Sequence, residues 1–189
     1  MKNRLKTQPV IEMGLFVAIA VVIDAIASLY SPFKYGGSIS FAMLLIFIIA
    51  IRHGWKAGIL SGFAFGILQA LVAVGLGTIY VVGAFQFILD YLLAFMVLGV
   101  AGLFKNAKTK VLPFVLGMTL GSFLRYLAHG FSGVIFFGMF APEGVNVWFY
   151  SFILYNLPYM AASYGLSLVI GLILQRRGLI GYQLQKEEN

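Results

Sequence analysis

Six apolar runs, separated by short stretches with charge, glycine or proline, occupy most of this chain. They cover about residues 9–29, 37–51, 57–75, 79–104, 111–139 and 147–175. At about 1.5 Å of rise per residue, helices of this length cross or nearly cross a hydrocarbon layer about 30 Å thick. Lipid offers no partner for exposed backbone groups, so helices are the expected structure. The pattern predicts an all-α membrane protein with six transmembrane helices.

The composition agrees with a lipid environment and excludes several function classes. Of the 189 residues, 61% are hydrophobic and 10% are charged, which is more apolar surface than a small soluble globule can bury. Because cysteine is absent and only two histidines and six acidic residues are present, we expect no disulfide, no metal and no cofactor. The net charge is +7, but most of the basic residues lie in short stretches outside the apolar runs, as in membrane proteins. We therefore expect no nucleic-acid partner.

The basic residues predict how the chain lies in the membrane. Eleven of the thirteen lysines and arginines precede the first run, separate runs two and three or four and five, or follow the sixth. Such residues collect on the cytoplasmic side. We therefore expect a multi-pass protein of a prokaryotic plasma membrane with both termini in the cytoplasm. No repeat or long linker divides the sequence, so residues 1–189 are predicted to form one domain.

Two features of the sequence have more than one interpretation. The basic N-terminus followed by apolar residues 13–23 imitates a cleavable signal peptide, but we expect a retained first membrane helix. Gly14 and Ala18 place two small residues on one helix face, as Gly62 and Gly66 do in the third run. From the residues alone, internal packing is favoured for such pairs over docking of another subunit.

Four ionisable residues fall inside the apolar runs, where insertion of each charge costs about 3 kcal/mol. They are Asp24, Asp90, Arg125 and His129. Asp90 lies fifteen residues before Lys105 and Arg125 fifteen residues after Lys110. Both would therefore lie about 22 Å from the cytoplasmic edge, and neighbouring helices could bring them together. The spacing alone leaves open a buried Asp90–Arg125 ion pair or a ligand site.

Neighbouring polar and aromatic residues favour a ligand site in the outer half of the membrane. Tyr91 follows Asp90, and Ser132 and Phe136 continue the helix face of Arg125 and His129. Five further aromatic residues are expected at the same level, about half of them in the interfacial belt and the rest in a pocket wall. These are Tyr80, Phe137, Trp148, Tyr150 and Tyr155. Carboxylates and aromatic faces together suit a flat, cationic ligand.

The stretch Gly130-Phe131-Ser132-Gly133 resembles the nucleophile motif of rhomboid-type intramembrane proteases. That chemistry needs a histidine base on another helix. His129 lies on the same predicted helix as Ser132, and His53 lies in a loop at the opposite side. We therefore expect no enzyme activity, with a serine protease as a remote alternative. A Walker A sequence is also absent, so any transport needs an external energy source.

Two long stretches carry a family resemblance. They are AFQFILDYLLAFMVLGVAGLF at 84–104 and RYLAHGFSGVIFFGMFAPEG at 125–144, followed by Tyr150, Ser151 and Asn156. With the six runs and basic loops, they resemble the thiamine-specific substrate-binding subunit of energy-coupling factor (ECF) transporters. The resemblance implies a six-helix protein that captures thiamine from outside and docks on a transmembrane coupling subunit with two ATPases, which alone use ATP. The alternative is the same fold binding another vitamin or a thiamine precursor.

The resemblance also implies site residues. Asp90 and Tyr91 would bind the aminopyrimidine edge, where a carboxylate can accept hydrogen bonds from the exocyclic amine. The other implied ligand-binding residues are Arg125, His129, Phe137, Tyr150, Asn156 and Tyr80. The loop 31–38, with Tyr35, would be a lid. The small residues Gly14 and Ala18 become candidates for docking on the coupling subunit.

The chain departs from the family pattern at three places. Asp90 replaces a glutamate, Phe137 replaces a tryptophan, and the spacing from Tyr150 to Asn156 is one residue longer. These departures leave room for altered affinity or a related ligand. The resemblance does not explain Asp24, which could line the pocket, cap a loop or meet Arg125.

Overall fold

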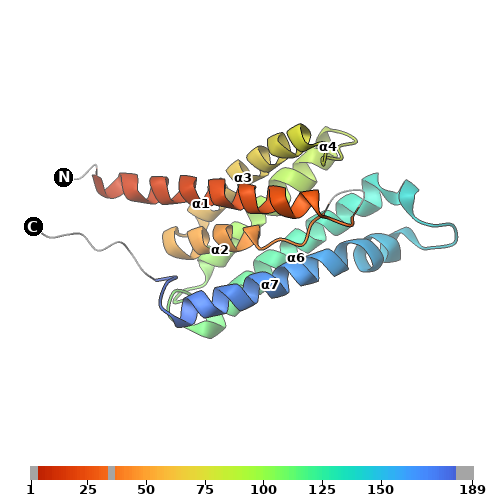
Figure 1. Cartoon of the computed structure of the whole chain (residues 1–189). Coiled ribbons are helices and arrows are strands. Elements are labelled where there is room, and N and C mark those ends of the chain that lie inside the picture. Colours follow the sequence, from red (N-terminus) through yellow and green to blue (C-terminus); the bar gives the residue numbers. More distant parts are fainter. Residues whose placement is uncertain (1–3, 34–36, 182–189) are drawn as a thin grey trace, which may run out of the picture.

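A computed structural model describes residues 4–33 and 37–181 as a bundle of helices without strands in these ranges (Figure 1). Three simple helices come first: α1 (Arg4–Leu29), α2 (Ala42–His53) and α3 (Trp55–Leu76). The fourth segment is composite: α4 (Ala84–Phe87), the π-helix η1 (Ile88–Leu93), α5 (Ala94–Met96) and the 3₁₀-helix η2 (Val97–Leu103). Then follow α6 (Val111–Phe136), the short η3 (Gly138–Phe140), and a sixth segment of π-helix η4 (Phe149–Asn156) and α7 (Leu157–Arg176). The predicted all-α class is confirmed.

Five of the six segments are long and apolar enough to cross a membrane, and α2 is the short one. Its 12 residues extend about 18 Å. Nine of its side chains are buried, since α1, α3, η2 and α7 surround it. Of the run predicted at 37–51, only the part from Ala42 onward is helical. Before it, Ser163 of α7 holds the chain extended by donating to the carbonyl of Ser38 and accepting from the amide of Ser40, both at 3.1 Å.

Glycines let the backbone of α3 contact the backbone of the fourth segment. A Cβ on Gly62 would overlap the carbonyl group of Phe95, and a Cβ on Gly66 would overlap the carbonyl oxygen of Tyr91. This pair of small residues therefore packs inside the protein, as small residues commonly do between membrane helices. By contrast, a Cβ on Gly14 would meet no atom within 4 Å, and Ala18 is exposed. The two small-residue pairs have different surroundings.

An ion-pair cluster closes the end of the bundle where α1 begins and α7 ends (Figure 1). Arg52 pairs with Glu12 of α1, and its Nε donates to the carbonyl of Ile180 at 2.9 Å. His53 Nε2 lies 2.9 Å from the other carboxylate oxygen of Glu12. The cluster ties α1, α2 and the segment after α7 together. The cytoplasmic location of this end stays a prediction.

The contact at Gly62 gives a stability prediction. Replacing Gly62 with alanine should lower the free energy of unfolding by about 1–3 kcal/mol, because two backbones must separate to accept the methyl group. Gly75→Ala is the matched control on the same helix, since its Cβ would meet nothing within 4 Å. Thermal unfolding in detergent measures both variants. Equal melting temperatures would contradict the close contact.

Candidate ligand-binding site

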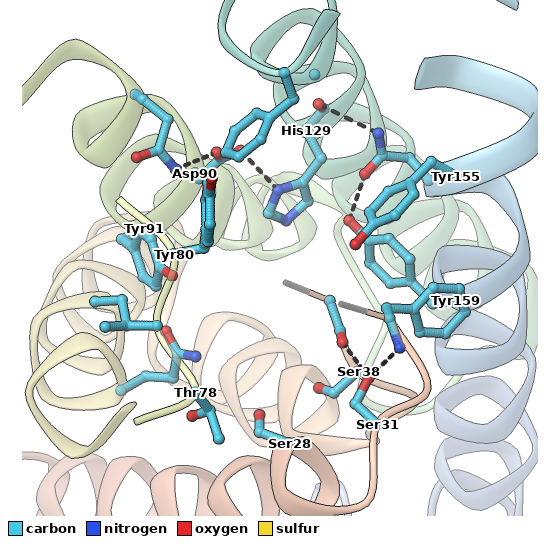
Figure 2. A pocket seen from close by; sticks show the side chains of 18 of the residues that line it. Ser28, Ser31, Ser38, Thr78, Tyr80, Asp90, Tyr91, His129, Tyr155 and Tyr159 are labelled. Carbon is cyan, nitrogen blue, oxygen red and sulfur yellow. Dashed lines mark hydrogen bonds and ion pairs between the residues drawn. The ribbon is translucent and has the colours of Figure 1, made fainter. Parts of the chain in front are cut away.

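A cavity of about 380 Å³ lies at the end of the bundle opposite the Arg52 cluster (Figure 2). Its volume is in the range of sites for small organic molecules. Its lining comes from α1, α3, the fourth segment, α6, η4 and α7, together with the chain before α2, residues 77–80 before α4, and Phe137 after α6. Eight of the residues implied by the resemblance line it: Tyr80, Asp90, Tyr91, Arg125, His129, Phe137, Tyr150 and Asn156. Tyr35 lies outside the described residues. That these residues bind a ligand stays a prediction.

Two π-helical segments supply much of the lining. Asp90 and Tyr91 lie in η1, and η4 contributes four residues that line the cavity: Tyr150, Ser151, Tyr155 and Asn156. A π-helix brings residues five apart onto one side, and such segments often occur at functional sites. Asn156 Nδ2 accordingly donates to the Ser151 carbonyl at 2.8 Å, and the rings of Tyr150 and Tyr155 lie 6.0 Å apart. Pro158, at the start of α7, lacks the amide that would continue a regular α-helical ladder.

Asp90 is the centre of the hydrogen-bond network in the cavity. Its Oδ1 lies 3.0 Å from His129 Nδ1, and its Oδ2 accepts from Ser132 Oγ and from Gln86 Nε2, both at 2.6 Å. A carboxylate offers about four acceptor positions. Three donors fill three of them, and the side chain of Asp90 is 14% exposed. About one acceptor position therefore remains for a ligand in the cavity.

The Asp90–Arg125 ion pair left open by the sequence does not form. Arg125 instead donates from Nε to His129 Nε2 at 3.3 Å, and its guanidinium lies 4.5 Å from the ring centroid of Phe95. Arginine can only donate, so His129 Nε2 must accept, and Nδ1 carries the proton that is donated to Asp90. His129 therefore stands between the two charges as a neutral imidazole.

Aromatic rings form a further part of the cavity wall. Tyr80 and Phe137 face each other with ring centroids 5.6 Å apart, and Phe33 meets Tyr159 at 5.2 Å. The hydroxyl of Tyr159 donates to Asn156 Oδ1 at 2.5 Å, which fixes the amide orientation. Of the five aromatic residues expected at this level, Trp148 is exposed and does not line the cavity, whereas four do: Tyr80, Phe137, Tyr150 and Tyr155.

Sequence reasoning missed several lining residues. Gln86 precedes Asp90 by one helical turn inside the stretch that carries the resemblance, so its polarity was a usable signal. Tyr159 had no signal beyond being aromatic, whereas Phe33 lies within the predicted lid 31–38. Gly130 and Gly133 of the serine motif are close-packing positions, because a Cβ would overlap the Phe152 ring and Ser151 Oγ respectively.

Asp24, which the resemblance left unexplained, lines the same cavity from α1. It is 4% exposed and accepts a hydrogen bond from Ser38 Oγ at 3.3 Å. It does not lie within 4.0 Å of a basic group among the described residues. Of the three roles considered from the sequence, lining the pocket is the one the structure shows.

Comparison with known proteins gives concordant matches. Residues 10–180 match the family described as thiamine transporter protein. The thiamine transporter ThiT of Bacillus subtilis is 36% identical over 170 residues, covering 85% of this chain and 86% of the relative. ThiT of Lacticaseibacillus paracasei is 32% identical over 163 residues, covering 79% and 81%. The solved structure of ThiT from Listeria monocytogenes superposes with a TM-score of 0.70 at 26% identity, covering 92% of this chain and 94% of that one.

These matches confirm the resemblance drawn from the two long stretches of sequence. With five helices able to cross a membrane, they show a multi-pass cell membrane protein. The relatives are named as transporters and not as enzymes. The chain belongs to the thiamine transporter protein family.

Proposed function

We propose that this chain is the high-affinity thiamine-binding subunit of an ECF-type vitamin transporter. The observation that carries the proposal is the Asp90 network, in which a half-buried carboxylate keeps about one acceptor position open to a cavity lined in part by aromatic rings. The exocyclic amine of an aminopyrimidine is a donor suited to that position. The thiazolium ring is a flat cation, and aromatic faces such as those of Tyr80 and Phe137 attract it.

Transport in this proposal involves binding and reorientation without a covalent step. The loop 31–38, including Tyr35, closes over the ligand, and a separate coupling subunit with two ATPases supplies energy. Docking uses the α1 face at Gly14 and Ala18, which is exposed in the isolated chain. The alternative ligands, another vitamin or a thiamine precursor, fit the same cavity and are separated by competition.

The first prediction concerns the ligand and its anchor. The detergent-purified chain should bind thiamine one to one, and Asp90→Ala should weaken binding about 100-fold or more. The variant loses a charge-assisted hydrogen bond and leaves His129 Nδ1, Ser132 and Gln86 without their acceptor. Calorimetric titration measures both proteins, with riboflavin and biotin as control ligands. Tight binding of a control but not of thiamine would contradict the ligand assignment.

The second prediction separates binding from serine chemistry. Ser132 donates to Asp90 and has no hydrogen bond to a histidine, so Ser132→Ala should weaken thiamine binding by only about five- to tenfold. Titration measures the loss. A hydrolytic activity in the parent that vanishes in this variant, with thiamine binding unchanged, would favour the protease alternative instead.

The third prediction tests docking. Gly14→Leu should leave thiamine binding by the isolated chain intact but prevent copurification with the coupling subunit and its ATPases. Its matched control is Gly165→Leu on α7, because a Cβ at either glycine meets nothing within 4 Å inside this chain. Equal assembly of both variants would remove α1 from the docking surface.

A further inference from the structure

The cavity carries an unbalanced set of charges. Among the described residues, two acidic side chains, Asp24 and Asp90, and one basic side chain, Arg125, line it, and the hydrogen-bond pattern makes His129 neutral. With both carboxylates ionised, the set sums to one negative charge. An uncompensated charge in a low-dielectric site is costly, and a cation entering the site offsets that cost.

Asp24 is surrounded by neutral hydrogen-bond donors, and its bond to Ser38 is longer than any of the bonds that Asp90 accepts. Asp90 accepts three hydrogen bonds of 3.0 Å or less. Asp24 accepts a hydrogen bond from Ser38 Oγ at 3.3 Å, and the side chains of Ser40 and Gln69 also act on it as hydrogen-bond donors. Arg125 acts on Asp24 by charge attraction from beyond ion-pair distance. A buried carboxylate whose hydrogen-bond donors are all neutral favours a positively charged neighbour.

The two carboxylates lie at different walls. Figure 2 shows Asp90 and His129 on one side of the cavity, and Ser28, Ser38 and Thr78 across the open space from them. Asp24 belongs to the second side through its bond with Ser38. A ligand anchored at Asp90 therefore has Asp24 across the cavity from its anchored end.

We propose that Asp24 is a second acidic recognition residue, which selects organic monocations over neutral ligands of the same shape. A ligand with one positive charge makes the set of Asp24, Asp90 and Arg125 neutral. The inference rests on the proposed function, because it takes thiamine as the ligand and assigns Asp24 to the thiazolium charge. It differs from the role of Asp90, which binds the uncharged pyrimidine.

The test compares thiamine with 3-deazathiamine, in which a neutral thiophene replaces the thiazolium. Calorimetry gives the affinity ratio of the two ligands for each variant. The parent chain should prefer thiamine, and Asp24→Asn should reduce that preference roughly tenfold or more by weakening thiamine binding. Binding of deazathiamine by Asp24→Asn should stay near the parent value, which also shows that the variant folds.

Three controls separate the explanations. Asp24→Glu keeps the charge and should keep the preference, while Ser28→Ala, on the same wall, should not change it. Asp90→Asn should weaken both ligands to a similar extent, because they share the pyrimidine. Should Asp24→Asn not fold, Asp24→Ser replaces it.

Two results would overturn the inference: no preference for thiamine in the parent chain, or the same preference in the neutral Asp24 variant. Failure of the parent to bind either ligand would instead contradict the proposed function.

Discussion

The hydrogen bonds on Asp90 join the parts of the molecule that enclose the cavity. The carboxylate receives Gln86 from its own segment and His129 and Ser132 from α6, so one side chain couples two membrane segments. Water in a soluble protein could satisfy the same groups, whereas inside a membrane bundle each must find a partner in the protein or in a ligand. The orientation of His129 follows from this network, and so does the separation of Arg125 from Asp90.

Position along the helix axes could be predicted from the sequence, but orientation around each helix could not. Counting residues from Lys105 and Lys110 correctly brought Asp90 near α6, although η1 and η2 depart from the α-helical rise that the count assumes. The count did not determine which α6 side chain meets the carboxylate, since that depends on helix rotation and on the π-helical turn of η1. His129 and Ser132 occupy that position, and Arg125 stacks over Phe95 instead.

The π-helices explain another limit of sequence reasoning. The spacing from Tyr150 to Asn156 is one residue longer than the family pattern, which looked like a departure from the site. In η4 the wider turn accommodates such a residue, and both side chains still line the cavity. Apolar periodicity carries little information about such turns, because every residue around them is compatible with a membrane helix. Asp24 illustrates a different limit. The sequence identified it as an ionisable residue that is costly to place in a membrane, but only the packing of the helices revealed that it lines the cavity.

The shortness of α2 has a consequence for how the site arises. This helix spans about 18 Å of a layer about 30 Å thick, and Met43 at its start contacts Arg125 with its sulfur at 3.5 Å from Nη1. The floor of the cavity is thus close to the first turn of α2. A helix long enough to cross the whole layer would extend beyond this turn into the space of the binding site. The cavity therefore occupies space that a longer α2 would fill, and its volume depends on the residue at which α2 begins. Extending α2 by one turn at its start would occupy it, whereas insertions after its last turn would leave it open.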